Sequence, residues 1–390
     1  MPISKLIWNM SLPIIASMLV QALYNIVDSW FVSRVSEQAL TAVSLAFPAQ
    51  NLMIGLATGT AVGVNALMGR ALGAGLRERA DKVANNGVFL AVVGFVISAL
   101  LGLTCSDLFF RSQTQVESII QMGNDYLRIV TIGSLGMFCQ IMYERLLQGT
   151  GRSILSMYTQ GLGAIINIIL DPIFIFGLKM GVAGAAVATI IGQIVAGTLV
   201  INYIRHFKTI PLTRNLFRMR WYYVKKIAAL GMGPCTNQLA MMIVQIVLNN
   251  SLSYYGAHSV YGQAIPLACA GIIMKVNQLF FSFPIGISQG LQPIASYNYG
   301  AENYPRVKQA YLKALTYAFV VAAVAFTLFQ VFPRQIIGIF GEGSPEYYEF
   351  AEKFFRIFLL FTLLNVIQPI TGNLFTAMGK PAKGMFISLT

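Results

Sequence analysis

Long apolar runs separated by short polar segments dominate the chain. A helix that crosses a bilayer needs about 20 apolar residues, and most of the runs reach or exceed that length. The longest ones predict tilted or kinked helices rather than additional spans. We expect ten membrane spans and the start of another after Pro381, at residues 11–34, 38–68, 83–106, 123–147, 153–177, 182–204, 227–255, 260–290, 310–332 and 353–377.

The composition agrees with this pattern. The chain is 56% hydrophobic and 11% charged, with a mean hydropathy of +0.67. Soluble domains carry about 25% charged residues, so the composition predicts an all-α integral membrane protein embedded in a lipid bilayer. The first apolar run is too long for the core of a cleavable signal and follows a single Lys5, which favours an uncleaved first span.

The formal net charge of +13 has a topological explanation. The basic residues are not interleaved with base-stacking aromatics, so we expect no nucleic-acid partner. They gather in alternate loops, while the intervening loops hold only Arg34, Arg111, Lys179 and Arg334. Because basic loops stay in the cytoplasm, this distribution predicts a multi-pass protein of the cytoplasmic (inner) membrane with a cytoplasmic amino terminus.

Polar landmarks recur in a fixed order and indicate an internal duplication. Gly151-Arg152 is repeated as Gly379-Lys380, Gly73 as Gly300, and Pro13 as Pro234. The repeated unit holds six spans, and an even number gives both copies the same orientation, so we expect two lobes related by an axis along the membrane normal. The predicted parts are an amino-terminal lobe 1–205, a cytoplasmic linker 206–226 and a carboxy-terminal lobe 227–390. On this register the second lobe is incomplete and lacks the last two helices.

The acidic residues restrict where a cation could bind. Of the fourteen acids, only Asp28 and Asp171 lie deep inside predicted spans. Glu144 adjoins Arg145 near a helix end, where a local ion pair is expected. There is no carboxylate between Asp171 and Glu302, and the counterpart of Asp28 in the second copy is Asn249. Any site that binds a cation through carboxylates must therefore lie in the first lobe.

Asp171 has the most informative neighbours. Asn167 lies one turn before it on the same helix face, and Pro172 removes a backbone donor and clashes with the carbonyl of Ile168. An ionised acid in the middle of a membrane helix costs about 3 kcal/mol on insertion scales, which favours a functional role, although a structural, hydrogen-bonded Asp is the alternative.

Two further polar residues complete the candidate site. Asn25 shares a face with Asp28, and Thr189 follows small residues that permit close helix approach. For Asn25 and Thr189 an interhelical hydrogen bond is an equally good explanation. Together these oxygens could coordinate Na⁺, or the two acids could share a proton, and the sequence does not choose between them. We expect no other metal and no resident cofactor.

Enzymatic chemistry finds no support in the chain. His206 and His258 are far apart near segment ends, and no combination with Ser, Cys or Asp suggests a catalytic triad. The chain is therefore not expected to be an enzyme. Lys275, inside the eighth span, is unusual; it could snorkel or form an ion pair, and its role is open.

Several motifs together resemble the multidrug and toxic compound extrusion (MATE) family of antiporters, of the bacterial type. They are Ser11-Leu-Pro13, Asn25-Ile-Val-Asp28, Gly149-Thr-Gly151-Arg152, Asn167-Ile-Ile-Leu-Asp171-Pro172 and Gln289-Gly-Leu-Gln292-Pro293. The resemblance implies a twelve-helix, two-lobed transporter that exchanges cationic amphipathic compounds for Na⁺ or H⁺. The family's cation-site positions match Asp28, Asn167, Asp171 and Thr189. The carboxylate that some members carry in the seventh span is not present here.

The expected function is thus secondary active multidrug efflux by alternating access of two lobes, carried out by a monomer. A flippase for lipid-linked oligosaccharides is the alternative transporter; it predicts basic residues along the cavity, of which Lys275 is the single deep candidate. Two rivals belong to other classes. A membrane enzyme predicts a cluster of catalytic polar residues at one membrane face, which the sequence does not show, and a non-transporting scaffold does not explain acids in the bilayer interior.

Overall fold

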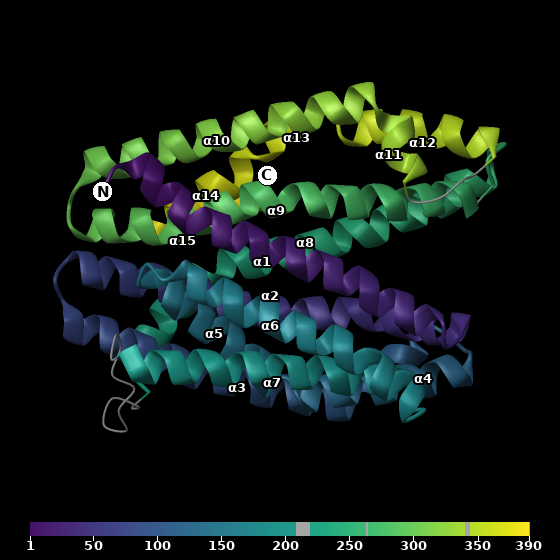
Figure 1. The fold of residues 1–390 in the computed structure, drawn as a ribbon, viewed down its shortest axis with the longest axis horizontal. Helices are drawn as coiled ribbons and strands as arrows, with labels where there is room; N and C mark the ends of the chain where they lie inside the picture. The colour runs from purple at the N-terminus through teal and green to yellow at the C-terminus, as the bar shows by residue number, and fades with distance from the viewer. Residues whose placement is uncertain (208–218, 263, 340–343, 390) are drawn as a thin grey trace.

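The computed structural model describes residues 1–207, 219–262, 264–339 and 344–389, and this part of the chain is helical without strands (Figure 1). Glycines with positive φ form the matching turns at Gly151 (φ 83°) and Gly379 (φ 76°), so the predicted duplication repeats a backbone conformation that favours glycine. The helices are α1 (Ile3–Ser33), α2 (Glu37–Gly73), α3 (Arg77–Arg111), α4 (Glu117–Ile132), α5 (Leu135–Gly149), α6 (Ser153–Pro172), the π-helix η1 (Ile173–Gly177), α7 (Val182–Phe207), α8 (Trp221–Ala257), α9 (Ala264–Gly300), α10 (Tyr304–Val331), α11 (Pro333–Gly338), α12 (Pro345–Phe358), α13 (Thr362–Asn365), α14 (Ile367–Ala377) and α15 (Pro381–Leu389).

Each predicted span contains helix, but the spans do not all remain single helices. In the described residues, eight helices are long and apolar enough to cross a membrane, or nine if the bent pair formed by α12 and α13–α14 counts as one span. The expected span 123–147 is instead divided into α4 and α5, which meet at Gly133 and Ser134. The expectation that two further helices are lacking is not confirmed. Residues 208–218 of the predicted linker lie outside the described residues.

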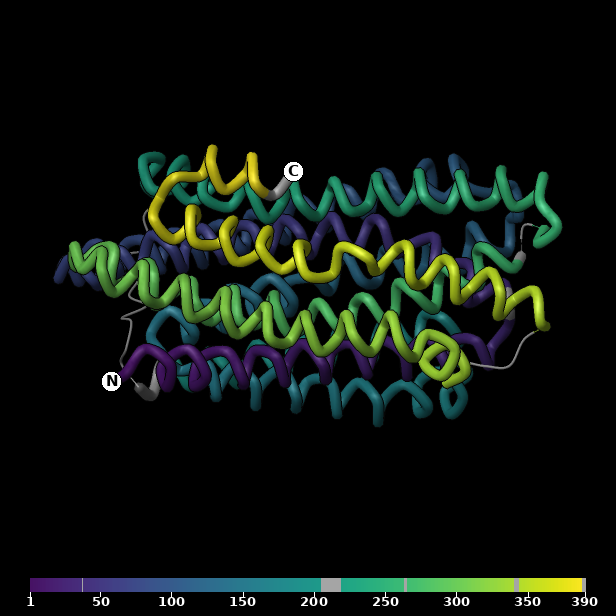
Figure 2. The backbone as a smooth tube through the Cα atoms, turned by 90° about the horizontal axis from the view of Figure 1, so that it is seen from above, coloured from purple at the N-terminus to yellow at the C-terminus, as the bar shows by residue number. Residues whose placement is uncertain are grey.

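Two hydrophobic cores lie side by side, and each includes the start of a helix from the opposite half of the chain. The first core is built mainly from α2 to α7 and also contains Tyr223, Ile227 and Leu230 from the beginning of α8. The second is built mainly from α9 to α14 and contains Ile3 and Ile7 from the beginning of α1. α1 and α8 therefore cross between the two bodies, as Figures 1 and 2 show for α1.

At the end near the amino terminus, glycines bring helices from the two halves of the chain into close contact. A Cβ added at Gly63 of α2 would lie 2.3 Å from the carbonyl oxygen of Ile227 in α8, and one at Gly290 of α9 would lie 2.3 Å from Ser11 Oγ of α1. Such separations are too short for any side chain, so helix approach at these places requires glycine. Gly63 and Gly290 occupy the same position in the two copies of the repeat. We call this region the glycine contact.

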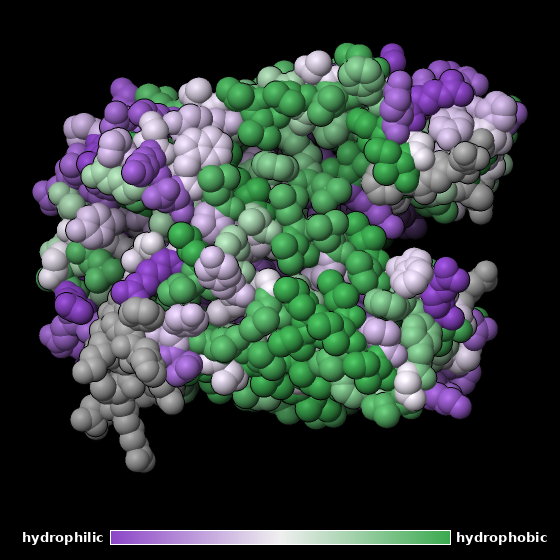
Figure 3. Space-filling view, in the orientation of Figure 1, coloured by the Kyte–Doolittle hydropathy of each residue, from purple (hydrophilic) through white to green (hydrophobic). Residues whose placement is uncertain are grey.

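The opposite end of the molecule is open. Figure 3 shows the surface hollowed between the two bodies at the end away from the amino terminus, with an apolar band around the middle and hydrophilic residues at both ends. The turns at 74–76, 150–152, 301–303 and 379–380 lie at the closed end together with residue 1 (Figures 1 and 2). Basic residues lie in or beside each of these turns, at Arg70, Arg77, Arg152, Arg306 and Lys380.

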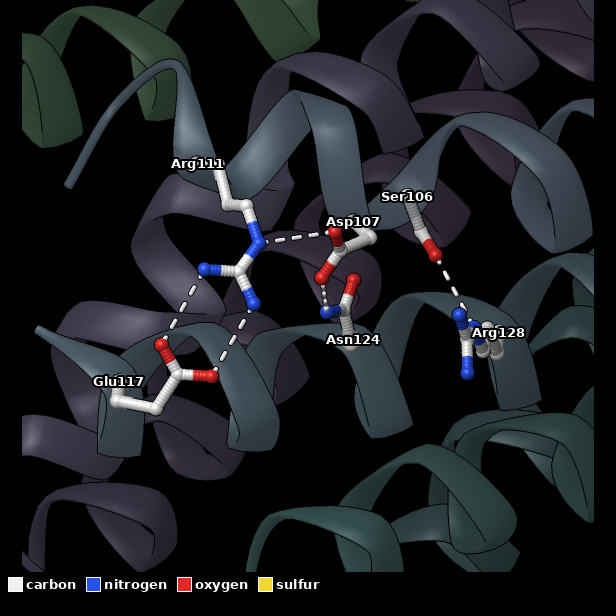
Figure 4. Close-up of polar contacts among 6 residues, drawn as sticks. All are labelled: Ser106, Asp107, Arg111, Glu117, Asn124 and Arg128. Atoms are coloured by element: carbon white, nitrogen blue, oxygen red, sulfur yellow. Dashed lines mark hydrogen bonds and ion pairs between the residues drawn. The ribbon is translucent and has the colours of Figure 1, made fainter. Parts of the chain in front are cut away.

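At the open end, a cluster of charged residues joins α3 to α4. Arg111 Nε donates to Asp107 Oδ2 at 2.9 Å and Arg111 also forms an ion pair with Glu117 at 3.2 Å (Figure 4). Asn124 donates to the other oxygen of Asp107 at 3.1 Å, and Arg128 donates to Ser106 Oγ at 3.1 Å. These contacts fix the turn at residues 112–116.

Candidate functional site

Asp171 lies near the end of α6 with its side chain fully buried. Pro172 follows it, and the backbone then changes from α-helix to the π-helix η1, in which Leu178 N–H donates to the Ile173 carbonyl at 2.9 Å. A proline lacks the N–H that would donate to the Ile168 carbonyl, so the regular hydrogen-bond ladder is interrupted beside the acid. The predicted loosening of the helix at Pro172 is thus present as a π-helical turn.

Asp28 and Asp171 meet across the contact between α1 and α6. Their carboxyl groups are within hydrogen-bonding reach of each other. Asp28 Oδ1 is buried and has no hydrogen-bond partner among the described residues. Buried carboxylate oxygens rarely remain unpaired, because desolvation without a partner is costly. An unpaired oxygen beside a second carboxyl group suits a proton or a small cation that is not bound to the protein permanently.

Asn167 links this pair to α7. Its carboxamide makes the most hydrogen bonds in one of its two orientations. In that orientation its nitrogen donates to Asp171 Oδ2 at 3.3 Å, and its oxygen accepts from Thr189 Oγ1 at 3.2 Å and from Thr189 N at 3.0 Å. α7 can come this close because Gly192 packs on the carbonyl of Gly163 in α6, where a Cβ would lie 2.7 Å away. The structure therefore brings Asp28, Asn167, Asp171 and Thr189 together from three helices.

The other sequence-predicted residues do not join this group directly. The side chain of Asn25 makes no hydrogen bond to the group in the part of the chain that the structure describes. Lys275 is exposed on α9, a helix that contributes no residue to this group. The local ion pair expected for Glu144 does not form in the described structure: Glu144 accepts from Gln140 at 2.9 Å, while Arg145 donates to Gln148 at 3.1 Å. Adjacent residues on a helix point about 100° apart, which separates these two side chains.

Sequence reasoning missed a second set of polar side chains around the carboxyl pair. Tyr24 hydrogen-bonds Gln21, and Gln160 of α6 donates to Gln21 Oε1 at 2.6 Å. Tyr126 of α4 accepts from Gln50 of α2 at 2.9 Å, and both tyrosines lie close enough to the two acids to interact with their charge. The available signal was spacing, because Gln21, Tyr24 and Asp28 fall on one face of α1.

The chemistry of this group is that of an all-oxygen cation site. Carboxylate, carboxamide and hydroxyl oxygens are the ligands that hard cations prefer, and the paired acids offer the alternative of a shared proton. In the described residues, no group of three or more His, Cys, Asp and Glu side chains could hold a metal ion of another kind. The two acids belong to different helices, α1 and α6. If these helices move apart, the site can release its cation.

A carboxyl pair inside a two-bodied helical membrane protein, closed at one end and hollow at the other, defines a membrane transporter. The MatE family model matches residues 13–173 and 235–390, two segments that correspond to the two predicted copies of the repeat. The chain therefore belongs to this family of membrane transporters, as its motifs indicated.

Individual relatives agree with this assignment. The chain is 26% identical to the "Probable multidrug resistance protein NorM" of Thermotoga maritima, covering 99% of this chain and 82% of that protein. It is 26% identical to the "Multidrug export protein MepA" of Staphylococcus haemolyticus, covering 96% and 81%. A solved structure described as the outward-facing conformation of a multidrug resistance MATE family transporter superimposes with a TM-score of 0.90 at 25% identity, covering 100% of this chain and 86% of that one.

Proposed function

We propose that this protein is a secondary active exporter of small, cationic, amphipathic compounds, driven by H⁺ or Na⁺ that binds at Asp28 and Asp171. The observation that carries the proposal is the meeting of two membrane-embedded carboxyl groups, one with an unpaired buried oxygen. The multidrug names of its relatives support export of drug-like compounds. As a transporter it is not an enzyme, and it uses no resident cofactor.

The mechanism we propose is alternating access of the two bodies. Cation binding joins α1 and α6 through their acids, and α1 also packs on the opposite body through Ile15 and Gly286. A change in the spacing of α1 and α6 would therefore reach the glycine contact directly. If bound substrate weakens cation binding by some factor, linkage requires that bound cation weaken substrate binding by the same factor.

We further propose that the closed end faces the cytoplasm and the hollow end faces outward. The basic turns and the amino terminus share the closed end, as the positive-inside tendency requires for a cytoplasmic face. On this proposal the protein works as a monomer in the inner membrane, and the conformation described is its outward-open state. The flippase alternative is not favoured, because the NorM and MepA relatives are named for multidrug resistance and multidrug export, and Lys275 is the single basic side chain deep in the α9 span.

Efflux by matched variants tests this function. Asp28→Asn and Asp171→Asn keep the volume of each side chain and remove its charge, so we expect both to abolish export of a fluorescent cation at normal membrane levels. Asp107→Asn is the control, since it makes the same change in the charged cluster at the open end (Figure 4). Vesicles with separately imposed Na⁺ and pH gradients identify the coupling ion. Normal efflux by both site variants would exclude the proposal.

A further inference from the structure

The half of α9 near the open end has two contrasting faces. Cys269, Ile273 and Phe280 are buried in the core of their own body. On the opposite side of the helix, Gly271, Lys275 and Gln278 are exposed. Because these three follow one another at intervals of one turn, they form a continuous stripe that points away from the second core.

The same stripe continues toward the closed end and becomes the contact with α1. Gly286 packs on Ile15 and Gly290 on Ser11, which places this face of α9 toward the other body. Lys275 lies about three turns, or about 16 Å, from Gly286 toward the open end, and the helical repeat brings it nearly in line with Gly286, with Pro284 between them. After Ile15, α1 contacts α6 instead, through Gln21 and Asp28. The stripe is therefore uncovered where the two bodies separate, and Lys275 faces the hollow between them.

The charge of Lys275 has no partner in the described part of the chain, where it makes neither a hydrogen bond nor an ion pair. Among the acids of α12, the helix that packs on this half of α9, Glu349 pairs with Lys353 at 2.7 Å and Glu352 pairs with Arg334 at 3.7 Å. Asp28 cannot serve, since on α1 it lies on the side opposite Ile15, toward α6. A cation and a carboxyl pair are thus separated by the thickness of α1.

We propose that Lys275 binds an anionic group of the exported compound, so that amphipathic zwitterions bearing a carboxylate are better substrates than the same molecules without it. This inference rests on the proposed export function and names its substrate class. An ammonium group offers three donors and a compact charge that suits a carboxylate entering a wet hollow. The carboxyl pair behind α1 stays available to the coupling cation.

A matched pair of dyes tests this selectivity with the full chain in proteoliposomes. Rhodamine 110 carries a free carboxylate, and rhodamine 123 is its methyl ester with the same ring system. We expect Lys275→Gln to slow transport of rhodamine 110 roughly tenfold while leaving rhodamine 123 unchanged, since a hydrogen-bonded charge contributes at least that factor. Lys275→Arg should restore rhodamine 110 transport, and Gln278→Ala, one turn away, should change neither dye.

The outcomes separate this inference from the function it rests on. Equal effects of Lys275→Gln on both dyes, or none on either, overturn the zwitterion preference while export itself stands. Failure of the unaltered protein to move either dye under any cation gradient overturns the proposed function instead.

The location of Lys275 is testable without transport. In a background in which the native cysteines at 105, 139, 235 and 269 are serine, Lys275→Cys should react with a water-soluble, membrane-impermeant maleimide added at the open end. A cysteine placed at Val324, an exposed apolar position of α10, provides the lipid-facing comparison. If the two positions react equally slowly, Lys275 faces lipid, where a headgroup phosphate would be its partner, and the proposal is wrong.

Discussion

At the scale of single residues, the polar groups of the site differ in how many hydrogen-bond partners they have. The Asn167 carboxamide is shared between Asp171 on its own helix and Thr189 on α7, so each partner fixes the other. Asp28, in contrast, has one oxygen with no partner among the described residues. The fixed side of the site therefore lies on α6 and α7, and the adjustable side on α1, which is the helix that also contacts the other body.

Replacing Thr189 tests the fixed side. Thr189→Val removes the hydroxyl that donates to Asn167 and leaves a nearly isosteric side chain, so the carboxamide loses one partner and can rotate away from Asp171. We expect the concentration of coupling cation that gives half-maximal transport to rise about fivefold to tenfold, as loss of one hydrogen bond of about 1 kcal/mol predicts. Thr189→Ser keeps the hydroxyl and should behave like the unaltered protein. Equal behaviour of the two variants would show that the hydroxyl does not hold the site.

At the scale of the helices, α6 is two elements joined beside the acid. The α-helix ends at Pro172 and the π-helix continues to Gly177, so the backbone after Asp171 is wound differently from the backbone before it. Single π-helical turns inside α-helices are frequent at functional sites. Rewinding this segment as a regular α-helix would change the backbone next to Asp171.

Pro172→Ala tests whether this winding matters. Alanine restores the donor to the Ile168 carbonyl and favours a continuous α-helix through Asp171. We expect a more thermostable protein with slower turnover, and the cation affinity should change less than the turnover. Melting temperature and single-gradient vesicle transport measure the two effects. Faster turnover at unchanged stability would contradict a role for the interrupted helix.

The cluster of Arg111, Asp107 and Glu117 is expected to matter little for transport. Its ion pairs are about half exposed, and such pairs contribute about 0–1 kcal/mol. Arg111→Gln should lower the melting temperature by a few degrees at most and leave efflux unchanged. Loss of efflux at normal membrane levels would instead indicate that the α3–α4 turn moves during transport.

At the scale of the whole molecule, local patterns predicted the elements but not their exchange between bodies. Apolar runs located the spans, and the rarity of acids within them identified Asp28 and Asp171, because both signals are encoded in neighbouring residues. The division of the 123–147 span at Gly133 depends on Ile190 of α7 packing where a side chain would stand, with a Cβ only 2.2 Å from it.

The crossing of α1 and α8, like the approach of Tyr126 to the site, depends on contacts between residues far apart in sequence. Gly63 and Gly290 are equivalent in the repeat, yet nothing in a single chain indicates that each would pack on a helix from the opposite half of the chain. Contacts of this kind decide which end of the molecule is closed.

The glycine contact should set the balance between the two states of the transporter. Gly63→Ala and Gly290→Ala each add a methyl group where a Cβ would stand 2.3 Å from an atom of a helix from the opposite half of the chain, and such overpacking costs about 1–3 kcal/mol. This cost falls on the state that is closed at the amino-terminal end, so both variants should shift the population toward opening there. Gly161→Ala is the control, because a Cβ at Gly161 meets nothing within 4 Å.

Cys235 offers a native reporter for that shift. Cys235 lies half-buried on α8. A Cβ added at Gly59 of α2 would lie 3.4 Å from the Cβ of Cys235, so separation of α2 from α8 at the closed end would expose the Cys235 thiol. With the other three cysteines replaced by serine, we expect its reaction with a water-soluble maleimide to become about fivefold or more faster in both alanine variants, the factor that about 1 kcal/mol provides. Because the two glycines belong to opposite halves of the repeat, similar acceleration by both would show that the closed end opens as one unit, whereas acceleration by Gly63→Ala alone would confine the effect to the α2–α8 pair.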